Sequence, residues 1–117
     1  MVQVSEPRIE RVSPPPRAGI AVVELAGELD LAVQDRFRSV ADEIVAERPE
    51  LVVADMTGVE FMDSTMLREV LRAHSTLEEA GARLIVAGAQ PAVTRLFELT
   101  GTDEVLALAD SRDAALA

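Results

Sequence analysis

Short runs of branched aliphatic residues alternate along this chain with longer segments in which apolar residues recur every three or four positions. Runs typical of strands lie at residues 8–12, 19–27, 51–55, 82–88 and 104–109. Segments with helical spacing begin after Asp30, near Ser64 and at Pro91, and a brief helix capped by Asp110 or Ser111 closes the sequence. Strands alternate with helices, so the pattern predicts an α/β fold with a small mixed sheet of four to five strands flanked by about four helices.

Each predicted helix carries one apolar stripe and a recognisable end. The stripes are Val33, Phe37, Val40, Ala41 and Ile44 in the first helix, Leu67, Val70, Leu71, His74 and Leu77 in the second, and Val93, Leu96 and Phe97 in the third. Asp30 is a suitable N-cap for the first helix, which ends before Pro49. Gly81 and Gly101 are suitable stops for the other two.

The composition fits one domain with an aliphatic core. The 117 residues are 49% hydrophobic but only 3% aromatic, so Val, Leu, Ile and Ala must fill the interior. Residues 1–18 are expected to form an edge strand and a Pro-rich turn, and residues 19–117 the main body of the same single domain.

Charge and hydropathy narrow the classes of partner and location. The net charge of −10 argues against nucleic acid and anionic membranes as partners. The sequence has no cysteine, and its first ten residues lack the basic and apolar regions of a signal peptide. No apolar stretch approaches the roughly 20 residues that span a bilayer. We therefore expect a soluble, cytoplasmic protein.

Catalytic residues are not evident. The one histidine, His74, lies on the apolar stripe of its helix, where a half-buried side chain is expected. Ser64 lies ten residues earlier, roughly 15 Å away along a helix, so the two cannot act as a nucleophile and its base. The sequence predicts no enzyme activity, no metal site and no cofactor.

The segment F-M-D-S-T-M-L, residues 61–67, is the strongest functional candidate. Asp63 or Ser64 would cap the helix that follows. Four apolar side chains surround the hydroxyls and cannot all face inward, so we expect Met62 and Met66 to form an exposed, adaptable patch for docking a protein. A helix N-terminus also tolerates an added phosphate, because its dipole and free N–H groups favour an anion.

The ordered motifs of the chain resemble a known family. They are G-E-L-D, then L-V-V-A-D-M-T-G-V-E-F-M-D-S-T, then L-R-A-H, then G-A-R-L-I-V-A-G-A-Q-P-A-V-T-R-L-F-E-L-T-G. Their order and spacing, from about Gly19 to Asp110, are similar to those of the bacterial anti-sigma factor antagonists, which are built on the STAS domain.

The resemblance implies a mechanism of partner switching in transcription regulation. The partner would be an anti-sigma factor that is also a GHKL-type serine kinase using ATP and Mg²⁺. The unphosphorylated antagonist would bind this kinase and release the sigma factor. Phosphorylation of Ser64, or less favourably Thr65, would switch the antagonist off, and a PP2C-type phosphatase would reverse the modification. Glu28 and Asp30 align with the G-E-x-D loop that lies beside the phosphorylated serine.

Taken together, these arguments predict one partner-binding face. Its residues are Glu28, Asp30, Met62, Asp63, Ser64, Thr65, Met66 and Arg68. The family's glycine after D-S-[ST] is Met66 in this chain. This difference favours the alternative that the chain is a phosphorylation-independent STAS interaction module in a signalling or transport assembly.

Overall fold

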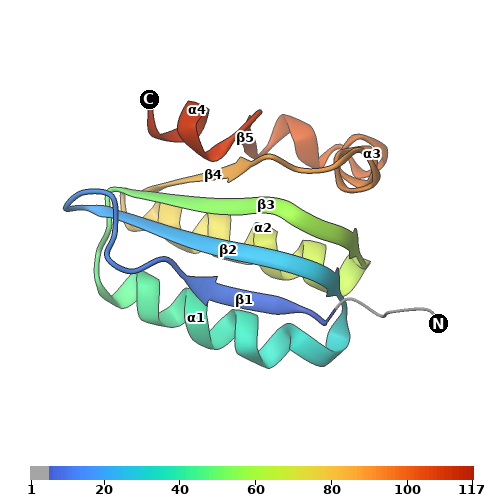
Figure 1. The fold of residues 1–117 in the computed structure, drawn as a ribbon, viewed down its shortest axis with the longest axis horizontal. Coiled ribbons are helices and arrows are strands. Elements are labelled where there is room, and N and C mark those ends of the chain that lie inside the picture. Colours follow the sequence, from blue (N-terminus) through green and yellow to red (C-terminus); the bar gives the residue numbers. More distant parts are fainter. Residues whose placement is uncertain (1–5) are drawn as a thin grey trace.

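Five strands form one mixed sheet in the computed structural model, which describes residues 6–117 (Figure 1). In spatial order they are β1 (Arg8–Arg11), β2 (Ile20–Leu29), β3 (Leu51–Met62), β4 (Arg83–Ala87) and β5 (Ala107–Ala109). β1 runs antiparallel to β2, and all other neighbours are parallel. The predicted mixed α/β fold is confirmed, and β2, β3, β4 and β5 all end at the same edge of the sheet. Residues 1–5 of the expected N-terminal segment lie outside the described residues.

Helices cover the two faces of the sheet unequally. The helices are α1 (Gln34–Ala46), α2 (Ser64–Glu79), α3 (Pro91–Thr100) and α4 (Arg112–Leu116), with short 3₁₀ turns η1 (Leu31–Val33) and η2 (Thr102–Glu104). α1 and α2 pack side by side against one face, whereas the short α4 lies with β4 and β5 on the other side (Figure 1). None of the described helices is long and apolar enough to cross a membrane.

Alternation along the central strands produces two apolar cores. On β3, Val52 and Ala54 join the larger cluster under α1 and α2, whereas Val53 points to the opposite face. There Val53 meets Val22 of β2 and Ala115 of α4 in the smaller cluster. Because both faces are covered around β3 and β4, residues 51–54 of β3 and 84–87 of β4 are uninterrupted apolar runs, as the sequence predicted.

β2 and β3 extend further than the sequence predicted. The strand predicted at residues 51–55 and the helix predicted near Ser64 leave residues 56–62 as a loop, but these residues continue β3, which remains paired with β2 as far as Leu29 and Met62. The two strands stay paired along this extension, but the pairing is irregular and contains two register shifts along β2. Gly58 permits the close approach, since a Cβ at this position would lie 2.8 Å from the Cβ of Ala26. The loop prediction was wrong because Thr57 and Gly58 are usually turn residues.

The ends of the helices largely follow the sequence signals. Asp30 accepts a hydrogen bond from the N–H of Ala32 at 2.9 Å and so caps η1, which leads into α1. Ser111, one of the two predicted caps, holds the N-terminus of α4. The last strand is shorter than residues 104–109, because residues 102–104 form η2 instead.

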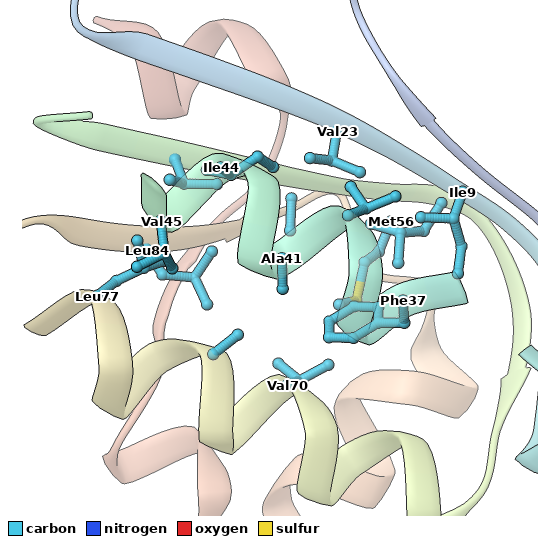
Figure 2. Close-up of a pocket in the computed structure, with 15 residues that line it drawn as sticks. Ile9, Val23, Phe37, Ala41, Ile44, Val45, Met56, Val70, Leu77 and Leu84 are labelled. Atoms are coloured by element: carbon cyan, nitrogen blue, oxygen red, sulfur yellow. The ribbon is translucent and has the colours of Figure 1, made fainter. Parts of the chain in front are cut away.

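A small apolar cavity of about 40 Å³ lies between α1, α2 and the sheet. Figure 2 shows Phe37 and Ala41 of α1 facing Val70 of α2 across it. Fifteen side chains line the cavity, and all are apolar. The lining offers no polar group to orient a ligand, so we treat the cavity as a packing defect rather than a binding site.

Candidate functional site

The predicted site residues lie at the carboxyl edge of β2 and β3. In the register of these strands Leu29 is opposite Met62, and the N–H of Asp63 donates to the carbonyl oxygen of Leu29 at 3.1 Å. β3 therefore delivers the start of α2 directly beside the end of β2. This arrangement brings the G-E-L-D segment and the D-S-T segment together, although they are more than thirty residues apart in the sequence.

Asp63, rather than Ser64, caps α2. Its carboxylate accepts a hydrogen bond from the N–H of Met66 at 2.9 Å, and its backbone is extended. Ser64 is the first residue of the helix and its side chain is exposed. Within the described part of the chain, the Ser64 hydroxyl makes no hydrogen bond. Because Asp63 supplies the capping oxygen, the Ser64 hydroxyl is not needed for the cap and remains accessible.

The prediction of an exposed methionine patch is wrong. Met62 is 5% exposed and Met66 is completely buried, whereas Phe61 is 50% exposed. Adjacent strand residues point in opposite directions, so residue 62 enters the larger core and residue 61 points away from it. The irregular pairing with β2 interrupts the strict alternation further back, where Val59 rather than Glu60 joins the same core. Met66 lies one helical turn after the cap, on the same inward face as Val70. Neither methionine is available to a partner in this structure.

Acidic side chains dominate the surface around Ser64. Glu28 and Glu60 are exposed, and Asp30 and Asp63 are partly exposed while they cap η1 and α2. Arg68, one turn into α2 from Ser64, is the nearest cation along the chain. It is exposed and forms no ion pair with any other described residue.

A polar network that the sequence did not reveal surrounds the buried Asp55, further back on β3. Asp55 accepts hydrogen bonds from the Thr57 hydroxyl at 2.6 Å and from Arg112 of α4 at 2.9 Å. Arg112 also pairs with Glu24 of β2 at 2.8 Å. Burial raises the pKa of Asp55, but the hydrogen bonds from Thr57 and Arg112 outweigh this effect and hold the pKa below its usual value. The network fastens α4 to the sheet.

A second ion pair missed by the sequence analysis joins α1 to α2. Glu69 is 4% exposed, and Arg38 donates to both of its carboxylate oxygens, with the shortest distance 2.8 Å. The hydrogen bonds from Arg38 lower the pKa of Glu69, against the opposing effect of burial. The helical period could have revealed this residue, because Glu69 and Val70 are adjacent on the inward side of α2.

The remaining polar candidates do not form a reactive centre. His74 is half-buried, as predicted, and its Nε2 lies 3.0 Å from Glu78 on the next turn of α2. Its Nδ1 is buried and has no hydrogen-bond partner within residues 6–117. Across residues 6–117, no group of three or more side chains of the types that hold metal ions is close enough to do so. The edge around Ser64 itself combines an exposed serine residue with exposed acidic residues.

Comparison with known proteins identifies the family of the chain. The family model described as the STAS domain matches residues 12–115. The anti-sigma F factor antagonist of Paenibacillus polymyxa is 30% identical over 99 residues, which cover 84% of this chain and 85% of that protein. The anti-sigma-F factor antagonist RsfB of Mycobacterium tuberculosis is 30% identical over 90 residues, or 77% of this chain and 73% of RsfB.

A solved structure gives the same assignment. The crystal structure of an anti-sigma factor antagonist from Mycobacterium paratuberculosis superposes with a TM-score of 0.83 at 26% identity. The match covers 95% of this chain and 92% of that one. By sequence and by fold, therefore, the chain belongs to the STAS domain family.

Proposed function

We propose that this chain is an anti-sigma factor antagonist that binds an anti-sigma factor with serine kinase activity and is switched off by phosphorylation of Ser64. The exposed and free hydroxyl of Ser64 carries the proposal. Because Asp63 supplies the capping oxygen, phosphorylation of Ser64 would break no hydrogen bond of the described structure. The relatives from Paenibacillus polymyxa and Mycobacterium tuberculosis are named as antagonists of anti-sigma F factors, which supports this class of partner.

A phosphate on Ser64 has a clear physical effect. It adds about −1.5 to −2 units of charge to a surface that already contains Glu28, Glu60 and Asp63. Within the chain, the N-terminus of α2 stabilises the added anion. Against a partner, the same charge must be desolvated at the interface, and a loss of about 1.4 kcal/mol weakens binding tenfold. The switch therefore requires no refolding.

The burial of Met66 bears on the phosphorylation-independent alternative. The family's glycine at this position suggested that a larger side chain would narrow access to the acceptor serine. Met66 instead belongs to the core, with none of its surface exposed, and so does not cover the exposed Ser64 at the surface. The departure from the family motif thus does not favour the alternative. Thr65 is less exposed than Ser64 and is the weaker acceptor candidate.

Phosphorylation can be tested directly. The chain would be incubated with purified anti-sigma factors of the serine-kinase type, ATP and Mg²⁺, and analysed by intact mass and peptide fragmentation. We expect one added phosphate on Ser64, which is lost in Ser64→Ala and retained in Thr65→Val. A PP2C-type phosphatase should remove it. Binding of the unmodified chain without any phosphate transfer would support the phosphorylation-independent module instead.

The effect of charge on binding requires a second measurement. Ser64→Asp should weaken binding of the same anti-sigma factor at least tenfold relative to wild type, whereas Ser64→Ala should bind as wild type does. If Ser64→Asp bound as tightly as wild type, the electrostatic account of the switch would be overturned.

A further inference from the structure

Five large apolar side chains are strongly exposed among the described residues. They are Leu31, Phe61, Leu99, Val105 and Leu108. Leu31 is 65% exposed and Phe61 is 50% exposed, and both lie at the edge of the sheet that carries Ser64. The other three belong to the segment from α3 to β5. Single exposed apolar residues are common, so position and surroundings must decide which of them matter.

Leu31 and Phe61 are close enough for one partner to cover both. The hydrogen bond between the N–H of Asp63 and the carbonyl of Leu29 joins the ends of β3 and β2. Phe61 precedes Asp63 by two residues, and Leu31 follows Leu29 by two. With 3.8 Å between consecutive Cα atoms, the two residues are separated by at most roughly 20 Å. A stable interface of about 800 Å² per partner is roughly 30 Å across and would include both.

The charges around this pair define the chemistry of the partner. Glu28 is opposite Phe61 in the strand register, and Asp30 directly precedes Leu31. Glu60 and Asp63 complete an acidic rim, and Arg68, four residues after Ser64 on α2, is the nearest cation along the chain. Interfaces typically combine a desolvated apolar centre with a charged rim of complementary sign.

We propose that Phe61 and Leu31 are the apolar anchors by which this chain recognises its partner, and that the partner offers an apolar pocket with a rim of Arg and Lys side chains. The inference rests on the proposed function for the identity of the partner as an anti-sigma factor. It assigns the docking role to two residues outside the set predicted from the sequence. They replace Met62 and Met66, which are buried.

The test compares anchors with matched controls. Binding of the purified anti-sigma factor that binds wild type would be measured by calorimetry for Phe61→Ala, Leu31→Ala, Leu99→Ala and Val105→Ala. We expect the first two variants to weaken binding by about 30-fold each, as anchor residues do. Leu99→Ala and Val105→Ala remove side chains of similar exposure elsewhere and should leave the dissociation constant unchanged. Circular dichroism and thermal melts would establish that all four variants are folded.

The contribution of the acidic rim is measured separately, through the salt dependence of binding and the rate of association. Asp30→Asn keeps the cap of η1, because Asn is an equally good N-cap, but removes one charge. Glu28→Gln removes a second charge without a change of shape. Both variants should reduce the salt dependence of binding and slow association. For a partner without a basic rim, neither variant would change the salt dependence.

The outcomes separate this inference from the proposed function. If no anti-sigma factor binds wild type, the proposed function fails and the inference fails with it. If wild type binds but Phe61→Ala and Leu31→Ala bind within twofold of it, the anchor assignment alone is overturned. Weaker binding by Leu99→Ala or Val105→Ala, with the first two variants unaffected, would place the interface on the α3–β5 segment instead.

Discussion

At the scale of single residues, Asp63 has a structural role that can be separated from any role in binding. Its carboxylate satisfies the N–H of Met66 at the start of α2. We expect Asp63→Ala to lower the free energy of unfolding by about 1 kcal/mol, and Asp63→Asn to lower it by much less, because Asn also caps helices. Urea denaturation would measure both. Ser64→Ala is the control and should be neutral, so a loss for Ser64→Ala equal to that for Asp63→Ala would contradict the assignment of the cap.

Asp55 should contribute to the acid sensitivity of the fold. The bonds from Thr57 and Arg112 lower its folded pKa below the unfolded value of about 3.9. A depressed carboxyl pKa gives stability that is present above about pH 4 and is lost as the pH falls through the folded pKa. Asp55→Asn should therefore be less stable than wild type at pH 7 and lose less stability on acidification. Thermal melts from pH 7 to pH 3 would test this, and parallel pH profiles for the two proteins would contradict it.

The sequence identified the right segment around Ser64 but assigned its side chains to the wrong faces. With residues 56–63 as a loop, no strand pattern constrains Met62, and the sequence allows both methionines to face solvent. In the structure, residue 62 of β3 faces the core and residue 61 faces outward. A continued strand requires Phe61 and Met62 to face opposite ways, but which of them faces the core depends on the irregular pairing with β2. Ser64 does lie at the start of the helix, as predicted, and its phosphorylation stays a prediction.

At the scale of elements, the alternating pattern predicted the order and type of the strands and α-helices, and it failed where tertiary contacts override local signals. Gly27 and Gly58 are turn formers by propensity, yet both lie within strands. Gly27 has a φ of +82°, and a Cβ there would lie 2.5 Å from the carbonyl oxygen of Glu6. Such irregular pairing depends on the neighbouring strand, which no local window of sequence contains.

The contact between α1 and α2 depends on the ion pair of Arg38 with Glu69. Arg38→Ala should destabilise the fold, because it leaves a buried carboxylate without its hydrogen-bond donors. Replacing both partners, as in Arg38→Ala with Glu69→Leu, should recover much of the lost stability, since no buried charge then remains. Chemical denaturation of the wild type, the two single variants and the double variant forms the required cycle. Strictly additive effects would show that the pair is not coupled.

At the scale of the whole molecule, the sheet is packed thickly on one face and thinly on the other. α1 and α2 form a full layer over the larger core, whereas the five residues of α4 complete the smaller one. The short helix is held by the salt bridges of Arg112 with Asp55 and Glu24. The polar network compensates for the small apolar area that five residues can bury. The carboxyl edge around Ser64 lies beyond this network and remains open on the side to which Phe61 points.

The cavity between the helical layer and the sheet offers a final test of the packing. Val70 of α2 is 1% exposed and lines this space of about 40 Å³. Val70→Ile adds one methylene group that the cavity can accommodate, and we expect the free energy of unfolding to rise by up to about 0.8 kcal/mol. Val53 is 0% exposed, belongs to the opposite core and is not among the side chains that line this cavity. Val53→Ile should therefore overpack that core and destabilise the protein by about 1–3 kcal/mol. Urea denaturation would measure the free energy of unfolding of both variants. Equal changes for the two would mean that the walls of the cavity relax and fill it.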